Sequence, residues 1–264
     1  MEKVLLRKSR LKVCLFLIRF SPIELMGREY IPMIQDQFRK SKLPNFQERE
    51  VTNFRFQNGP NPELKKEFEW LFYGVTKQEL VIITKSSIAF QVTTYEHFEE
   101  FQKRFIELFG MFARITELYE AGVFEFLGLR YINAIEEKDW RTYLTSSYAG
   151  ITLPKDIADP RFSGNFSSFA QVVTPLSDGL LGNIVVKVLQ NNQGILVPPD
   201  IAMIEAPVIQ KDKLVTQLDI DHFILLNSAK MTDTLLVTLS RQLNQGCERV
   251  FFDALSEKAK KEWI

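Results

Sequence analysis

The sequence has few of the residues that build most active sites. Its 264 residues include only two histidines and two cysteines. No Cys-x-x-Cys or His-x-x-x-His spacing surrounds His97 or His222, which excludes the common structural zinc sites. Cys14 and Cys247 are expected in a buried strand and on a buried helix face, so they do not indicate a disulfide-stabilised secreted protein. A reducing cytoplasm is the expected compartment.

Glycine and serine motifs for common chemistry are also lacking. The glycines form no Gly-x-Gly-x-x-Gly and no Gly-Lys-Ser/Thr sequence, which argues against the common nucleotide-binding loops. No Gly-x-Ser-x-Gly elbow is present either. We therefore expect no cofactor, no bound metal and no catalytic residue, and we favour a protein that is not an enzyme.

Neither excess charge nor a long apolar run is present. Lysine plus arginine and aspartate plus glutamate are both 33, so no net charge attracts nucleic acid or an anionic membrane. The apolar run Val13–Ile18 is short and is flanked by Lys12 and Arg19, which predicts a strand and not a signal peptide. No 18-residue apolar segment occurs, so no membrane association is expected.

What the sequence does contain is phenylalanine, 22 residues against 7 tyrosines and 3 tryptophans. Phenylalanine has no polar group, so this composition indicates a dry core and favours a dry interface over a base-stacking platform. The length lies at the upper edge of a single domain. One large domain and two closely packed lobes both fit.

Hydrophobic periodicity predicts mostly strands and three helices. Strands are expected at 11–20, 45–56, around 68–74, and at 80–83, 88–92, 124–135, 166–175, 180–190 and 214–225. Helices are expected at about 24–40, 95–119 and 232–255. Pro32 predicts a kink or a late start in the first helix. The densest turn signal is Asn58–Pro62.

The helix at 95–119 has apolar residues at alternating spacings of three and four, from Phe98 to Tyr119. Such a stripe is typical of a coiled-coil seam and also of a helix lying across a sheet. We favour the sheet, because phenylalanine fits the holes of a two-stranded coiled coil poorly.

These elements predict an α+β protein of antiparallel sheets covered by long amphipathic helices. Residues 1–144 and 145–264 each end a run of strands with a long helix, so we expect two similar lobes with a boundary in the Ser-, Gly- and Pro-rich segment 145–168. One continuous domain remains the alternative.

The most informative polar residues are Arg130, Asp219 and Asp221. Strand alternation places Asp219 and Asp221 on one face, where they could hold a divalent cation in a metal-dependent hydrolase or nuclease. Such a site needs a third acidic ligand and usually a lysine, and the candidates Glu205 and Lys211 lie across a proline-containing loop.

We favour a structural role for the same three residues. Arg130 lies among apolar neighbours in a central-looking strand, so it is expected to be half-buried and to need a carboxylate partner. An ion pair with Asp219 or Asp221 would join the two predicted lobes. The Arg130→Ala substitution should then lower stability by about 2–4 kcal/mol.

A basic segment at the N-terminus is the second candidate site. It could contact phosphates without sequence specificity, as a nucleic-acid-binding accessory protein would. Lysines that protect a solvated edge strand give the same pattern, and we favour that interpretation. The residues are Lys3, Arg7, Lys8, Arg10 and Lys12.

Four short segments, taken in order, resemble a prokaryotic family that is described only as sporadically distributed among bacteria and archaea and has no established function. They are Tyr95–Phe101, Gly128–Asn133, Leu218–Asp221 and Phe251–Leu255 before Trp263. The resemblance spans nearly the whole chain and rests on the order and spacing of weak motifs. Sporadic distribution is typical of mobile or defence-type gene cassettes.

The resulting hypothesis is a non-catalytic protein. We expect a protein-interaction or regulatory accessory subunit of a defence-type cassette, acting as a homodimer together with a larger protein partner. The nucleic-acid-binding accessory and the metal-dependent hydrolase are the alternatives.

Overall fold

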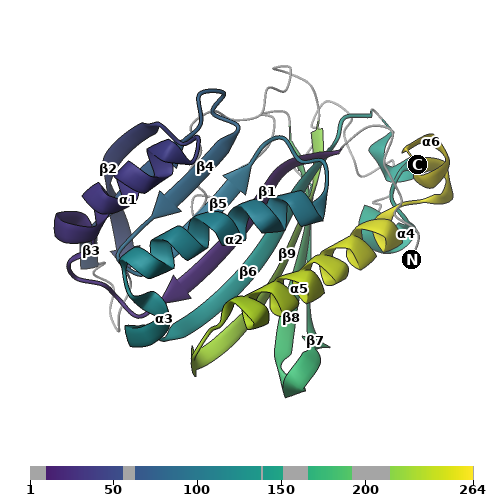
Figure 1. The fold of residues 1–264 in the computed structure, drawn as a ribbon. Helices are drawn as coiled ribbons and strands as arrows, with labels where there is room; N and C mark the ends of the chain where they lie inside the picture. Colours follow the sequence, from purple (N-terminus) through teal and green to yellow (C-terminus); the bar gives the residue numbers. More distant parts are fainter. Residues whose placement is uncertain (1–9, 56–62, 138, 151–165, 192–214, 264) are drawn as a thin grey trace.

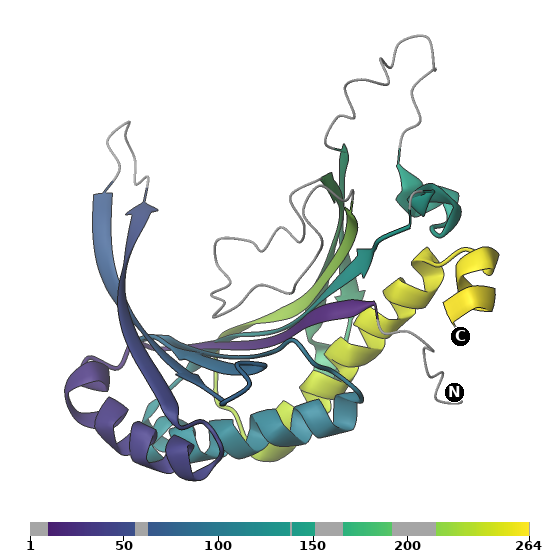
Figure 2. The same cartoon turned by 90° about the horizontal axis from the view of Figure 1, so that it is seen from above.

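The computed structural model describes residues 10–55, 63–137, 139–150, 166–191 and 215–263. The strands in these ranges form one antiparallel sheet of nine strands, in the order β2-β3-β4-β5-β1-β6-β9-β8-β7. The long helices lie together on one face of this sheet (Figure 1). Figure 2 shows that the sheet curves, with the helices on its convex side and both flanks rising away from them.

The α+β class is confirmed, and every predicted strand has a counterpart. The strands are β1 (Leu11–Phe20), β2 (Asn45–Arg55), β3 (Glu63–Tyr73), β4 (Glu79–Ile83), β5 (Ser87–Val92), β6 (Phe124–Ile135), β7 (Phe166–Pro175), β8 (Leu181–Asn191) and β9 (Val215–Ala229). The turn expected at Asn58–Pro62 lies outside the described residues, and the strands on either side of it pair with each other.

The described helices are α1 (Ile31–Lys40), α2 (Phe98–Ile115), α3 (Leu118–Ala121), α4 (Ser146–Ala149), α5 (Asp233–Ala254) and α6 (Glu257–Trp263). A π-helical turn (Met26–Tyr30) precedes α1, and 3-10 turns occupy Trp140–Thr142 and Ser177–Gly179. Pro32 lies in the first turn of α1, where its missing N–H costs no helical hydrogen bond. Proline therefore delays the helix, which is one of the two outcomes predicted.

The phenylalanine stripe of α2 packs on the sheet, as favoured from the sequence. Phe16 of β1 stacks against Phe101 and Phe105 of α2, with ring centroids 5.1 and 4.6 Å apart. All three side chains are buried in the main core cluster. Aromatic pairs at these separations add to the burial energy of each ring.

A few buried polar groups connect the helices to one another and to the sheet. Gln102 Nε2 of α2 donates to Ser240 Oγ and to the Val237 carbonyl of α5, at 2.6 and 3.0 Å. The Tyr131 hydroxyl of β6 donates to Asn244 Oδ1 of α5 at 2.5 Å. Burial raises the pKa of the Tyr131 hydroxyl well above its usual value. These bonds fix how α2 and α5 lie across the sheet.

The two cysteines lie in this core. Cys14 and Cys247 are fully buried free thiols, and burial raises the pKa of each well above its ordinary value. A buried thiol of raised pKa is chemically inert.

The chain repeats one arrangement on either side of the central β1–β6 pair. After β1, it runs out to the edge at β2 and returns through β3, β4 and β5 before α2. After β6, it runs out to β7 and returns through β8 and β9 before α5. The sheet is continuous across the predicted lobe boundary, whose residues 151–165 lie outside the described part. The second copy of the arrangement therefore begins at β6 in the chain, and both copies belong to one sheet. The division predicted at residue 145 does not separate two sheets.

Candidate interaction surface

Arg130 and the two aspartates meet on the face of the sheet opposite the helices. Arg130 of β6 lies directly across from Asp221 of β9 in the strand register. Its guanidinium forms a two-pronged contact with the diagonal neighbour Asp219, with Nε donating to Oδ1 at 2.8 Å and Nη2 to Oδ2 at 2.6 Å. The ion pair expected from the sequence thus forms, with Asp219 as the acceptor.

This ion pair is almost completely buried. Only 5% of Arg130 and 1% of Asp219 is exposed. Both Asp219 oxygens are engaged by the guanidinium, so they are not available to hold a cation. Among the described residues, no group of three His, Cys, Asp or Glu side chains could hold a metal ion. Glu205 and Lys211 lie outside the described ranges.

The basic segment is only partly described, and its described residues are engaged. Arg10 Nη2 lies 2.5 Å from Glu137 Oε1, and its guanidinium stacks 4.3 Å from the Trp263 ring centroid. Lys12 Nζ lies 3.2 Å from Glu136 Oε1. These contacts tie the start of β1 to the end of β6 and to α6.

The edge-strand interpretation of this segment is wrong. The strand that follows it, β1, is central and pairs with β5 on one side and β6 on the other. The described charges, Arg10 and Lys12, therefore do not protect an exposed edge. Lys3, Arg7 and Lys8 lie outside the described residues.

The two histidines occupy different settings. His222 lies on the helix-facing side of β9 and is 1% exposed, with Nδ1 2.9 Å from the Leu243 carbonyl. Burial lowers the pKa of His222, which favours the neutral ring. Because the Leu243 carbonyl can only accept, the hydrogen bond requires the proton on Nδ1. Gly182 and Gly246 contact the ring closely, since an added Cβ would lie 2.8 and 2.3 Å from its nitrogens. His97 is the N-cap residue of α2, one position before the helix in which it was predicted.

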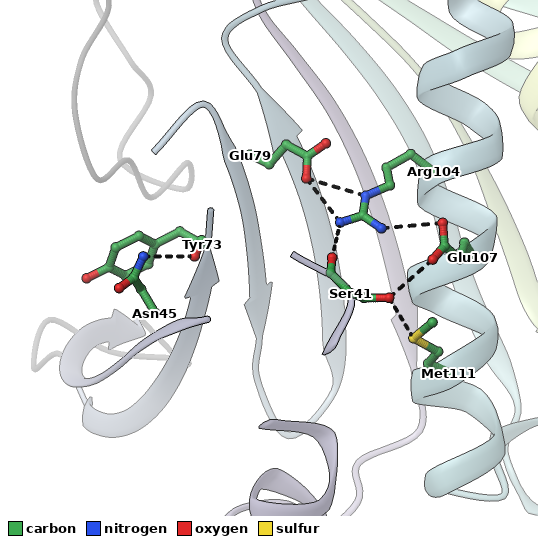
Figure 3. A network of polar contacts seen from close by, with 7 residues as sticks. All are labelled: Ser41, Asn45, Tyr73, Glu79, Arg104, Glu107 and Met111. Atoms are coloured by element: carbon green, nitrogen blue, oxygen red, sulfur yellow. Dashed lines mark hydrogen bonds and ion pairs between the residues drawn. The ribbon is translucent and has the colours of Figure 1, made fainter. Parts of the chain in front are cut away.

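A cavity of about 560 Å³ lies where α2 begins, beside the turn between β3 and β4, and Arg104 lines it. The guanidinium of Arg104 donates from Nε and Nη2 to Glu79 Oε2 at 3.3 and 3.2 Å, and from Nη2 to the Ser41 carbonyl (Figure 3). Its Nη1 lies 3.3 Å from Glu107 Oε2. Arg104 thus neutralises two carboxylates and satisfies the C-cap carbonyl of α1, so it is not poised to bind an anionic ligand.

Exposed apolar side chains gather at one end of the sheet. Of the nine large hydrophobic residues that are exposed in the described ranges, five belong to β7, β8 and β9. We call these five the β7 surface: Phe169 (64% exposed), Val172 (54%), Val173 (62%), Leu181 (59%) and Leu225 (56%).

Strand β7 is exposed on both faces. Val172 pairs with Ile184, whose side chain belongs to the helix-covered core, and Phe169 pairs with Lys187 on the opposite face. Both Val172 and Phe169 are nevertheless more than half exposed. Helix α5 lies mainly over β6 and β9 and has fewer contacts with β8. In Figure 1, β7 is the outermost of the three strands at this end.

The two edges of the sheet differ in charge. Strand β2 carries Glu48, Arg49 and Glu50, and Arg49 forms an ion pair with Glu69 of β3 at 2.6 Å. Strand β7, Phe-Ser-Ser-Phe-Ala-Gln-Val-Val-Thr-Pro, contains no charged residue. Charged side chains discourage pairing of an edge with another strand, and an uncharged apolar edge permits it. The β7 edge is therefore the one suited to strand addition.

Sequence reasoning missed this surface. The segment 166–175 reads as a strand among others, because nothing in its own residues says which neighbours it pairs with. One feature of the sequence could have indicated the surface: segment 166–175 contains no charged residue, unlike the other long strands. No family model matches the chain, and no curated protein is significantly similar to it.

Proposed function

We propose that this protein acts by binding other protein chains, which add to its sheet at the β7 edge. The observation that carries the proposal is strand β7, which has no charged residue and is exposed on both faces of the sheet. Its side chains Phe169, Val172 and Val173 are accessible. An added strand gains main-chain hydrogen bonds from such an edge, and the flanking side chains select the partner. The opposite edge, β2, lacks these properties.

In this proposal the protein is a cytoplasmic, non-catalytic accessory subunit, whose repeated halves form a scaffold for self-association and for a larger partner. The resemblance to the sporadically distributed prokaryotic family supports placing it in a defence-type gene cassette. None of the helices in the described ranges is long and apolar enough to cross a bilayer. The genes adjacent to its own provide the direct check on the cassette.

The test is site-specific photo-crosslinking in the native host. A photoreactive phenylalanine analogue replaces Gln171 on β7, and in a matched control it replaces Thr52 on the charged edge β2; both positions are exposed. We expect discrete crosslinked products from position 171, identified by mass spectrometry, that disappear when Val173→Lys adds a charge to β7. Equal crosslinking at 171 and 52, or no effect of Val173→Lys, would refute binding at this edge.

A further inference from the structure

The hydrogen-bonding direction along β7 can be assigned. The Leu176 N–H donates to the Leu180 carbonyl at 2.9 Å, and this pair continues the unbroken register of β7 with β8. In an antiparallel ladder the residues that bond to one neighbour alternate with those that face away from it. Thr174, Val172 and Ala170 therefore bond toward β8, and the outward-facing residues are Phe169, Gln171 and Val173.

Pro175 agrees with this assignment. It falls in the outward-facing set, where its missing N–H removes no bond to β8. No hydrogen bond in the described part of the structure involves the outward backbone groups of Phe169, Gln171 or Val173. The outer edge of β7 is thus a run of donors and acceptors directed away from the sheet.

The internal repeat provides a comparison for this edge. Strands β5, β4 and β3 of the first half correspond to β9, β8 and β7 of the second. In the first half a further antiparallel strand, β2, pairs with β3 over eleven residues. Among the described strands, none occupies the corresponding position beside β7.

We propose that this position is filled by β7 of a second copy of the chain, related by a two-fold axis perpendicular to the sheet. Gln171 then lies opposite the second copy's Gln171, with Phe169 facing Val173 on one side of the sheet and Ala170 facing Val172 on the other. The inference rests on the proposed function and names its partner. This pairing of two β7 strands would join the nine-stranded sheets of the two copies into one continuous sheet.

Two features favour this occupant and this register. An antiparallel pair of identical strands opposes no like charges here, because β7 has none. With the axis at Gln171, Phe169 faces valine, and aromatic residues pair well with β-branched ones. An axis at Ala170 would place Phe169 opposite Gln171, and an axis at Val172 would place it opposite Pro175.

The experiment is cysteine crosslinking of the full-length protein at low concentration. Opposed residues in such a pair have Cα atoms about 5.5 Å apart, within the range of a disulfide. Gln171→Cys should give a disulfide-linked dimer at least tenfold faster than Thr52→Cys, the control on β2. The native thiols of Cys14 and Cys247 are buried and do not compete.

The register has its own test. Val173→Cys alone should not crosslink, because position 173 lies four residues along the strand from its counterpart. A mixture of Val173→Cys and Phe169→Cys chains should form the heterodimer. Strand pairing buries less surface than a standard interface, so sedimentation equilibrium should show a monomer–dimer equilibrium that Val173→Lys shifts to monomer.

Three results would overturn the inference: equal crosslinking of Gln171→Cys and Thr52→Cys, a failure of the mixed pair, or a wild-type monomer at every concentration. These outcomes leave the proposed function standing if position 171 is still crosslinked to a different protein in the host. Far-UV circular dichroism of each variant checks that the fold is retained. All four substituted positions are at the surface.

Discussion

At the scale of single residues, Arg130 and Asp219 form a buried ion pair. Its charges are removed from water, and each satisfies the other through two hydrogen bonds. A buried pair of this kind contributes little compared with an apolar replacement, but removing one partner leaves the other charge unpaired in the interior.

Because Arg130 is almost fully buried and not half-buried as the sequence predicted, we expect Arg130→Ala to lower the free energy of unfolding by about 3–5 kcal/mol, in place of the change of about 2–4 kcal/mol expected from the sequence. Denaturant titration followed by circular dichroism measures this change. The double variant Arg130→Met with Asp219→Leu should recover much of the loss, because both charges of this ion pair are then removed together. A melting transition unchanged by Arg130→Ala would contradict the structural role of this pair.

We expect His222 to make the stability of the protein depend on pH. Its folded-state pKa is lowered by burial, so as pH falls below about 6.5 the unfolded chain takes up a proton before the folded protein does. Stability is then greatest above pH 6.5 and decreases as pH falls toward the folded-state pKa. We expect His222→Gln to reduce the loss of stability between pH 7.5 and 5.5, measured by denaturant midpoints.

His97→Gln, which removes the other histidine of the chain, is the comparison variant for this experiment. The role of His222 is contradicted if the two variants show the same dependence on pH.

At the scale of elements, the contact between α5 and β9 is set by glycine. A Cβ at Gly246 would lie 2.3 Å from His222 Nδ1, and the ring cannot retreat because Gly182 is close to its other nitrogen. Because Gly246 has no side chain, helix α5 can approach the His222 ring of β9 closely at this point.

Gly246→Ala should therefore destabilise the protein by about 1–3 kcal/mol through overpacking. The matched control is Gly110→Ala in α2, where the nearest neighbouring atom to an added Cβ is Arg114 Nη1 at 3.6 Å, an ordinary contact. That change should stabilise the protein by about 0.4–1 kcal/mol. Thermal unfolding of both variants measures the contrast, and equal effects would exclude crowding at His222.

At the scale of the whole molecule, the described strands form one continuous sheet, and the boundary predicted at residue 145 does not separate two sheets. Residues 1–144 include β6 but lack β9, with which β6 pairs over eleven residue positions. A fragment of residues 1–144 would expose that edge and leave Arg130 without Asp219.

We expect this fragment to aggregate or to show no cooperative unfolding, whereas the full chain unfolds in a cooperative transition. Size-exclusion chromatography and circular dichroism melting distinguish the outcomes. A monomeric fragment with its own sharp transition would restore the lobe at 1–144 as an independent unit.

What could be predicted from the sequence follows from local periodicity and composition. The strand at 124–135, the stripe of α2 and the delayed start of α1 at Pro32 depend on backbone geometry and on residues close in the chain. The apolar neighbours of Arg130 in the sequence predict that it is buried and paired with a carboxylate. Asp219 and Asp221 were both predicted as possible partners. The choice of Asp219 depended on strand register.

Tertiary structure alone decided the order of the strands. The basic segment before β1 resembles the protection of an edge, yet β1 is central, and the uncharged strand β7 is the edge. Backbone hydrogen bonds have the same form in every strand, so a strand's own residues do not specify its neighbours. Packing of α2 and α5 across the sheet, between residues far apart in the chain, selects which strands become neighbours. The resulting strand order leaves the β7 surface exposed.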